Sequence, residues 1–291
     1  MSRARLVQVL SVIALAGLFA LLAGCGGDDD SSDGGSTVSV SAEDCTPDKL
    51  ETKNANTLTV ATDDPAFPPY FVDNDPTNGK GFESAVAYAI ADQLGYSRDQ
   101  VKWTVEAFNS SYAPGPKDFD FDVNQISITP QRSQQVDFSS PYYEAKQAVV
   151  ALKDSDAANA TSLDDLKGAN FGVQIGTTSL DAVNDEIEPD SEPQVFDTSN
   201  DVVQALKNGS VDAVVVDVPT AFYLTAVQVP EAKVVGQFAA PGGDQWGALL
   251  EKNSPLTDCV SFAIDELRDS GELADIENTW ITEKTDAPVI D

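Results

Sequence analysis

Two spacings of apolar residues run along this chain, one typical of helices and one typical of strands. Between residues 81 and 94, large apolar side chains recur at every fourth position from Phe82 to Leu94, which is the spacing of a core-facing helix. Residues 211–216 instead form a valine-rich run, as expected for a strand covered on both faces. The chain therefore combines the two element types.

Applied to the whole chain, these patterns place strands and helices in alternation. Strands are expected at 57–62, 101–105, 122–128, 171–174, 194–196, 211–216, 233–235 and 246–250. Helices are expected at 81–94, after Thr129-Pro130, at 180–187, at 201–207 with Ser199 as the cap, after Pro219, at 256–267 and at 271–280. Two prolines and one glycine disfavour a helix at 109–118. Alternating strands and helices indicate an α/β fold with largely parallel sheets, in a chain long enough for two lobes.

The first residues have the pattern of an export signal. Arg3 and Arg5 precede an apolar run over residues 6–22, and small residues lead to Cys25. The segment resembles the lipobox of bacterial lipoproteins, which implies a signal peptide at 1–24 and a lipid on Cys25; an ordinary leader is the alternative. Residues 25–44 are rich in Gly, Ser and Asp and are expected to form a flexible tether.

The chain contains three cysteines, an odd number for an exported protein. Lipidation of Cys25 would leave Cys45, just before the first strand, and Cys259, in a late helix. A bridge between them would fasten the start of the domain to its end and contribute roughly 3 to 5 kcal/mol by restricting the unfolded chain. Two free, buried cysteines are the alternative.

The net charge and the absence of histidine exclude several classes of partner and of chemistry. The net charge is −31, and removing a leader that contains two arginines makes it more negative still. Nucleic acids and anionic membrane surfaces are therefore unsuitable partners. The chain has no histidine, which removes the commonest general acid or base and the histidine-dependent triads and metal sites. No catalytic residue, metal site or cofactor is predicted.

Arg132 is a candidate anion-binding residue. It is one of three arginines beyond the leader, and it follows a buried strand at the start of a short helix. A guanidinium binds a carboxylate through two parallel hydrogen bonds, which a lysine cannot do. A surface ion pair is the plainer interpretation for a lone arginine.

Five segments in order resemble family 3 of the bacterial extracellular solute-binding proteins, which supply polar amino acids to ABC importers. These segments are LTVATDDPAFPPYF at 58–71, GFESAVAYAIADQLG at 81–95, ISITPQRSQQVDFSSPYY at 126–143, LDDLKGANFGVQIGTTS at 163–179 and VDAVVVDVP at 211–219. The resemblance implies the two-lobe fold of type II periplasmic binding proteins, with a ligand cleft between the lobes.

The resemblance also implies where the chain crosses between lobes. The two hinge crossings fall near residues 145–150 and 236–242. Residues 45–147 and 240–291 would form a discontinuous first lobe holding both ends, and residues 148–239 the second lobe.

The same resemblance assigns a ligand site that agrees with the chemistry of a free amino acid. Arg132 and the backbone N–H of Thr178, at a helix start, would bind the carboxylate. Asp217, where the valine-rich strand ends before a proline-led helix, would bind the ammonium with the Ser127 hydroxyl and the Gln125 carbonyl. Without the resemblance, an ordinary turn or helix cap would explain Thr178 and Asp217 equally well.

Four further residues are assigned to the walls of the pocket. Phe67 matches the family's stacking aromatic residue, with Phe108 as a second wall, although phenylalanines commonly serve only as core. Asp64 matches a position that meets the ligand's side chain. Gln174 occupies a specificity position. Gln125 departs from the family, which often has glycine there.

We therefore expect a monomeric substrate-binding component of an ABC importer, closing over a polar amino acid and delivering it to a membrane permease. It would be exported and held at the outer face of the cell membrane by the lipid on Cys25. Asp64 favours a polar or cationic ligand. Two alternatives remain at this stage: a family-related dehydratase of prephenate-like acids, and a sensing domain that serves a separate signalling partner.

Overall fold

The computed structural model describes residues 40–240, 242–281 and 287–291. The predicted signal peptide, Cys25 and the predicted tether up to residue 39 lie outside the described residues. No helix within the described ranges is long and apolar enough to cross a membrane.

Most of the predicted strands and helices are present, but two strands, Asp137–Glu144 and Gln147–Leu152, were not predicted. The strands are β1 (Leu58–Thr62), β2 (Val101–Val105), β3 (Phe121–Asp122), β4 (Asp137–Glu144), β5 (Gln147–Leu152), β6 (Phe171–Gln174), β7 (Gln194–Phe196), β8 (Ala213–Asp217), β9 (Ala232–Phe238) and β10 (Gln245–Leu250). The α-helices are α1 (Phe82–Gln93), α2 (Phe108–Ser111), α3 (Thr178–Ala182), α4 (Ser199–Lys207), α5 (Val218–Tyr223), α6 (Thr257–Ser270) and α7 (Glu272–Trp280). The π-helical turns Val183–Ile187 and Leu224–Gln228 extend α3 and α5.

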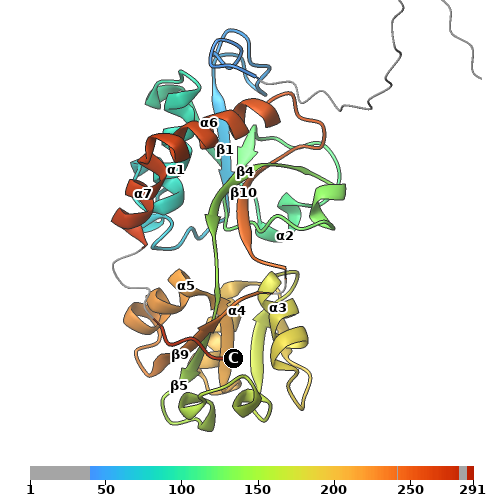
Figure 1. The fold of residues 1–291 in the computed structure, drawn as a ribbon, viewed down its shortest axis with the longest axis vertical. Coiled ribbons are helices and arrows are strands. Elements are labelled where there is room, and N and C mark those ends of the chain that lie inside the picture. The colour runs from blue at the N-terminus through green and yellow to red at the C-terminus, as the bar shows by residue number, and fades with distance from the viewer. Residues whose placement is uncertain (1–39, 241, 282–286) are drawn as a thin grey trace, which may run out of the picture. The chain divides into compact units, whose positions relative to one another are not determined.

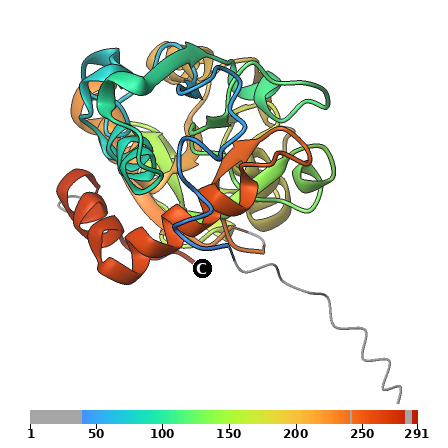
Figure 2. The ribbon, with the colours of Figure 1, turned by 90° about the horizontal axis from the view of Figure 1, so that it is seen from above.

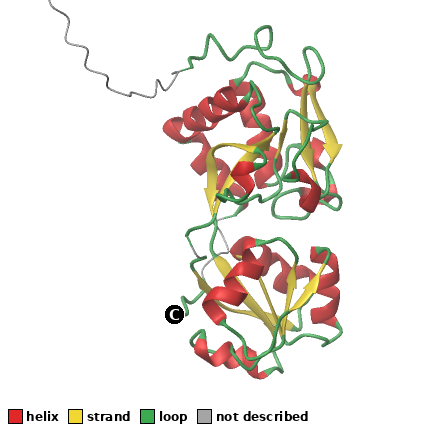
Figure 3. Cartoon of the chain, turned by 90° about the vertical axis from the view of Figure 1, so that its right-hand side faces the viewer, coloured by secondary structure: helices red, strands yellow, loops and turns green. Residues whose placement is uncertain are grey.

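Two separate five-stranded sheets define two lobes. The first lobe is built on the order β2-β1-β3-β10-β4, and the second on β7-β6-β8-β5-β9. Figure 3 shows the two groups of strands, each flanked by helices. Both sheets are mixed rather than largely parallel, because β10 runs antiparallel to β3 and β4, and β5 runs antiparallel to β8 and β9. Strands β4 and β5 flank one connection between the lobes, and β9 and β10 flank another.

Each lobe has its own hydrophobic core. In the first lobe, α1, α6 and α7 contribute buried residues to one large cluster, including Val86, Ile90, Val260 and Leu267. Figure 2 shows α6 and α7 lying along one side of this lobe. In the second lobe, the fully buried valines of β5 and β8 alternate between two clusters on opposite faces of the sheet. The prediction of a strand covered on both faces is therefore confirmed.

The predicted disulfide is present in the first lobe. Cys45 and Cys259 are bonded, with their Cα atoms 5.4 Å apart and a sequence separation of 214. Both residues are buried, at 1 % and 4 % exposure. The bond therefore ties the segment before β1 to α6.

Two of the connections between the lobes lie next to each other. Residues 145–146 connect β4 to β5, and residues 239–244 connect β9 to β10 (Figure 1). The Ala145 N–H donates to the Asp244 carbonyl at 2.7 Å, so the two connections touch. Gln147 already belongs to the second sheet, through its pairing with Asp217 and Phe238.

The last described residues lie on the second lobe, whereas the sequence analysis assigned them to the first. Val289 pairs with Gln237 of β9, and Ile290 is buried in the second lobe's core. The Leu163 N–H also donates to the Asp291 carbonyl. The end of the chain therefore covers the β9 edge of the second sheet.

Several local predictions differ from the structure. The strand expected at 122–128 ends at Asp122, and Gln125 has a positive φ of 49°, which turns the chain out of the sheet. The helix expected after Thr129 is a single 3₁₀ turn at Arg132–Gln134, although the Thr129 hydroxyl does accept from the Arg132 N–H.

Two further local differences concern helix starts. The cap of α4 is Thr198 rather than Ser199, because the Thr198 side chain accepts from the Asp201 N–H. A short helix, α2, starts at Phe108 and extends into the segment expected to be non-helical. It ends before Pro114 and Pro116, which the sequence analysis had identified as helix breakers.

Candidate functional site

A cavity of about 400 Å³ lies between the two lobes. Both lobes contribute to its lining, and all nine predicted ligand-binding residues are part of it: Asp64, Phe67, Phe108, Gln125, Ser127, Arg132, Gln174, Thr178 and Asp217. A volume of this size is within the range of about 300–1,000 Å³ found for small-molecule sites. The fold therefore brings residues from the ends of several strands and loops into one cleft.

Arg132 is buried and held from both lobes, so it is not a surface arginine. Its side chain is 7 % exposed. Nη1 donates to the Ser127 carbonyl at 2.8 Å, and Nη2 donates to the Gly176 carbonyl of the second lobe at 2.9 Å. The guanidinium also lies 4.6 Å from the ring centroid of Tyr112 and 5.4 Å from that of Phe108.

These contacts fix the plane of the Arg132 guanidinium without neutralising its charge. Burial lowers the pKa of this group, but arginine stays protonated in proteins. A guanidinium has more N–H donors than two carbonyls use, and carbonyls offer dipoles rather than full negative charges. Arg132 is thus pre-oriented for an anion in the cleft.

Thr178 is the first residue of α3 and lies across the cleft from Ser127. The hydroxyl oxygens of Ser127 and Thr178 are 3.4 Å apart, which joins the two lobes at this point. The cap of α3 is Thr177, whose hydroxyl accepts from the Leu180 N–H. The Thr178 hydroxyl donates instead to Asp244 Oδ2 at 2.9 Å. The helix start predicted from the sequence is therefore present, with the capping role on the preceding residue.

Asp217 is the last residue of β8 and precedes α5. Its carboxylate lines the cavity and accepts from Gln147 Nε2 at 2.8 Å. Burial, and next the neighbouring Asp244, raise the pKa of the Asp217 carboxyl well above its ordinary value. The carboxylate therefore lacks a cationic partner strong enough to offset its burial.

The predicted wall residues have distinct surroundings. Phe67 is half-buried in the loop after β1, and Phe108, in α2, packs its ring at 5.6 Å from Tyr112. Asp64 is exposed, and its carboxylate accepts from Asn74. Gln174 accepts a hydrogen bond from Ser199.

Gln125 lines the cleft, but its donors point away from it. Its backbone N–H and its side-chain amide both donate to the carboxylate of Glu83 in α1. Tyr142 donates a third hydrogen bond to the same carboxylate, at 2.5 Å. Burial raises the pKa of Glu83 to about 7. A glutamine at this position thus stabilises a buried carboxylate of the first lobe.

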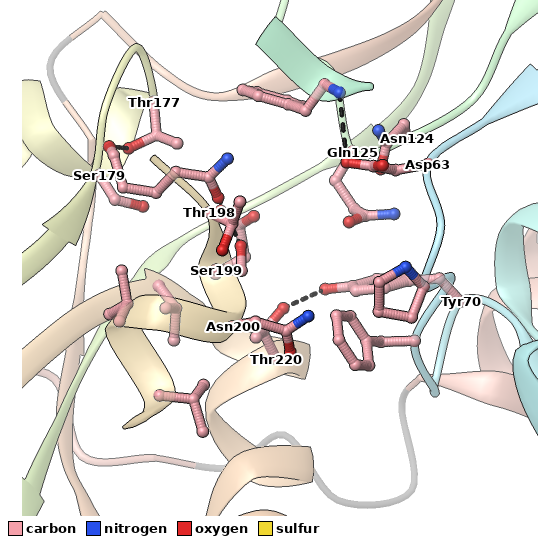
Figure 4. Close-up of a pocket in the computed structure, with 18 of the residues that line it drawn as sticks. Asp63, Tyr70, Asn124, Gln125, Thr177, Ser179, Thr198, Ser199, Asn200 and Thr220 are labelled. Atoms are coloured by element: carbon pink, nitrogen blue, oxygen red, sulfur yellow. Dashed lines mark hydrogen bonds between the residues drawn. The ribbon is translucent and has the colours of Figure 1, made fainter. Parts of the chain in front are cut away.

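The sequence analysis missed several cleft residues. Asp63 and Asp197 line the cavity from opposite lobes, and the Tyr70 hydroxyl is 2.9 Å from that of Thr220 across the cleft. Figure 4 shows Tyr70 and Thr220 pointing toward each other. It also shows Thr198, Ser199 and Asn200 on the side opposite Asp63 and Gln125.

Two of these residues had a usable sequence signal and the others did not. Asp63 adjoins the predicted Asp64, and Asp197 directly follows the predicted strand at 194–196. Strand ends are where ligands bind in α/β folds. Tyr70 and Thr220 are 150 residues apart and meet only because the lobes face each other.

Among the described residues, no group of three or more Asp, Glu and Cys side chains could hold a metal ion. The site offers instead one fixed cation, several carboxylates and hydroxyl groups around one cavity. Such an arrangement can bind a zwitterion.

Comparison with known proteins identifies the family. Residues 58–283 match the family described as "Bacterial extracellular solute-binding proteins, family 3", and the chain belongs to this family. The arginine-binding extracellular protein ArtP of Bacillus subtilis (strain 168) is 31 % identical over 212 residues, which are 69 % of this chain and 78 % of ArtP.

Solved structures agree with the fold. An ancestral arginine-binding protein bound to arginine aligns with a TM-score of 0.64 at 34 % identity, over 78 % of this chain and 99 % of that one. An ancestral amino acid-binding protein described as a precursor of cyclohexadienyl dehydratase aligns with a TM-score of 0.63 at 28 % identity, over 78 % and 96 % of the two chains. The predicted two-lobe fold of the solute-binding family is confirmed.

Proposed function

We propose that this protein is the substrate-binding component of an ABC importer, which closes over one free polar amino acid and delivers it to a membrane permease. One observation carries the proposal: Arg132 of the first lobe and Asp217 of the second line the same cavity. A zwitterion matches this pair of charges, and each buried charge needs a partner of opposite sign.

The ligand's carboxylate would bind at Arg132. The guanidinium is already oriented by the Ser127 and Gly176 carbonyls, so little side-chain entropy is lost when the anion arrives. The N–H of Thr178, at the start of α3, adds a second donor in the arrangement implied by the family. The ammonium would bind at Asp217, whose buried carboxylate gains most from a cation.

The ligand's side chain is best matched by a long cation. Asp63, Asp64 and Asp197 add carboxylates to the lining beyond the Arg132 and Asp217 pair, and the cavity exceeds what a small amino acid fills. The relative from Bacillus subtilis and the ancestral structure are both named for arginine. L-Arginine is therefore our first candidate, with L-lysine and L-glutamine as the nearest competitors in size and polarity.

Closure follows from the placement of the two charges on different lobes. Only when the lobes approach can one ligand meet both Arg132 and Asp217, so the ligand stabilises the closed form by its differential affinity. Hinge closure around ligands is a known motion of periplasmic binding proteins. The Tyr70 and Thr220 hydroxyls form a contact that exists only when the cleft is shut. A permease would recognise this closed form.

We further propose that the protein acts outside the cell as a monomer, held at the membrane by a lipid on Cys25. The support is the export pattern of the first residues and the extracellular family to which the chain belongs. Lipid analysis of the protein purified from its membrane would test this. A mature N-terminus other than Cys25, without lipid, would contradict the anchor but not the binding function.

A thermal-shift screen of the common amino acids tests the binding function. A cleft ligand should raise the melting temperature in proportion to the logarithm of its concentration over its dissociation constant. We expect L-arginine to give the largest shift, and calorimetry to show one site. If no amino acid shifts the melting temperature, the proposal is wrong. Loss of prephenate absorbance on mixing would instead support a dehydratase.

A further inference from the structure

One buried glutamine connects the ammonium end of the cleft to the hinge. Gln147 is the first residue of β5, directly after the connection from the first lobe, and is fully buried. Its Nε2 donates to Asp217 Oδ1 and to Asp244 Oδ2, both at 2.8 Å. Asp244 directly precedes β10, in the other connection between the lobes. A single amide group thus joins two carboxylates.

The orientation of this amide is fixed by its other end. Ser179 donates its hydroxyl proton to Gln147 Oε1 at 2.6 Å. Carboxylates accept hydrogen bonds and cannot donate them when ionised, so the NH₂ group must face Asp217 and Asp244. The glutamine therefore cannot rotate to satisfy another partner.

Only one of the two carboxylate oxygens of Asp244 accepts hydrogen bonds. It is 1 % exposed, and its Oδ2 accepts from both Gln147 and Thr178. Its Oδ1 has no hydrogen-bond partner and is buried. A buried, half-paired carboxylate beside a second carboxylate is costly when both are ionised.

The surroundings of Asp217 contain one cation and several anionic or ionisable groups. The amide of Gln147 stabilises the charged form of Asp217, while burial and Asp244 oppose it. The titratable groups that face Asp217 from the elements packed against it are Glu83 of α1, Arg132 of the 3₁₀ turn, Tyr70 after β1, Tyr143 of β4 and Asp244 before β10. Of these only Arg132 is positive, and it is held by carbonyls.

We propose that Gln147 is a positioning residue for Asp217, and that its shared amide couples ammonium capture to Asp244 at the hinge, so that the bound ammonium displaces a proton from Asp217. The inference rests on the proposed binding of an amino acid at Asp217. In the ligand-free cleft, the raised pKa of Asp217 favours its protonated form. When the ammonium arrives, the carboxylic O–H bond breaks, the proton passes to solvent, and the ammonium supplies the positive charge in its place.

The sign of the pH dependence follows from this exchange. Because the ligand prefers ionised Asp217, affinity should rise as pH rises toward the pKa of Asp217 in the ligand-free protein and become constant above it. A variant in which Asp217 ionises less readily shifts the curve of affinity against pH to higher pH. A variant in which Asp217 ionises more readily shifts it to lower pH.

The test measures L-arginine affinity by calorimetry between about pH 4.5 and 7, where the ligand's own ammonium and carboxylate stay charged. Gln147→Met removes the amide that stabilises ionised Asp217, so its curve should move up by about one pH unit. Asp244→Asn removes the neighbouring charge with almost no change in shape, so its curve should move down by a similar amount. Gln237→Met, which replaces a glutamine of β9 whose amide donates to the Ala287 carbonyl, is the matched control and should not move the curve.

The outcomes separate this inference from the function on which it rests. Opposite displacements of the two variants, with proton release seen as a dependence of the binding heat on the buffer, support the coupling. Tight binding with unmoved curves in folded Asp244→Asn protein overturns it and leaves the function standing. Absence of binding by every amino acid overturns both. Asp244→Asn decides the question if Gln147→Met does not fold.

Discussion

The two ends of the cleft differ in how their charges are supported. At one end, Arg132 is oriented by carbonyls from both lobes and by the Tyr112 and Phe108 rings. At the other end, Asp217 is partly buried near a second carboxylate, with one amide between them. The anion end is pre-organised, whereas the cation end is incomplete.

This difference indicates which end supplies the selectivity for a ligand. A fixed guanidinium attracts any small carboxylate, because its geometry and charge are set in advance. The Asp217 end is relieved only by a group that carries positive charge, so simple organic acids should bind poorly there. If the proposed function is right, the Asp217 end should discriminate amino acids from other carboxylates.

The largest expected effect is on the stability of the first lobe, which holds Arg132, and not on binding in the cleft. Replacing both cysteines, as Cys45→Ala with Cys259→Ala, should lower the free energy of unfolding by roughly 3 to 5 kcal/mol, because the bridge closes a long loop in the unfolded chain. Urea unfolding measures this loss. Affinity for L-arginine should stay unchanged, since the bridge lies in the first lobe and joins no cleft residue; a parallel loss of affinity would contradict that separation.

Removing the pre-organised charge should abolish most binding. Arg132→Ala should weaken L-arginine binding by roughly tenfold or more, where each factor of ten is about 1.4 kcal/mol. Calorimetry measures the change, and circular dichroism checks that the protein is folded. Arg98→Ala is the matched control, because Arg98 stacks on Tyr88 of the first lobe and does not line the cleft. Equal affinities of the Arg132→Ala and Arg98→Ala variants would show that Arg132 does not bind the ligand.

Removing the other charge should separate binding from stability. Asp217→Asn should weaken binding about tenfold near neutral pH, since a neutral amide cannot balance the ammonium. The pKa of Asp217 is raised in the folded protein, so its contribution to stability is present below the unfolded pKa and is lost as pH rises through the folded value. The ligand-free variant should therefore melt higher than the wild type at alkaline pH, by about 1 kcal/mol of stability.

The stability of the ligand-free protein should respond in opposite directions to substitution of Arg132 and of Asp217. Arg132→Ala should lose both affinity and stability, because it also removes hydrogen bonds to two carbonyls. If ligand-free Asp217→Asn melts lower than the wild type at every pH, the description of Asp217 as an unsatisfied charge is wrong.

The smallest effect concerns closure. Tyr70→Phe removes one hydroxyl that meets Thr220 across the cleft, and a single neutral hydrogen bond contributes about 0.5–1.5 kcal/mol. Affinity should fall a few-fold, with the same loss in Thr220→Val. The double variant should lose no more than either single one, as measured by a double-mutant cycle. Additive losses would show that the two hydroxyls act separately.

Much of the fold could be predicted because apolar spacing is local. The four-residue spacing of 81–94 and the valine run of 211–216 became α1 and the central part of β8. The predictions that failed concern tertiary context. The strand expected at 122–128 stops at Asp122 because Gln125 turns back to bond Glu83, a partner 42 residues away.

The residues of the site also divide into those with a local sequence signal and those without one. Arg132, Thr178 and Asp217 stand at strand ends or helix starts, where free N–H groups and ligand contacts are expected, so their positions pointed to the cleft. Gln147 and Asp244 carry no local signal. Gln147 lies within a predicted hinge crossing, and Asp244 follows a pair of glycines, where an aspartate commonly serves only a turn.

The sequence by itself therefore determined most of the elements, the arginine proposed to bind an anion, the cysteine pair and the family, since each depends on residue type and short-range spacing. Only the tertiary structure decided which charges face each other. Two neighbouring connections between the lobes place Gln147 and Asp244 within hydrogen-bond distance although they are 97 residues apart. Electrostatic pairing depends on distance in space, and the chain alone does not specify that distance before it folds.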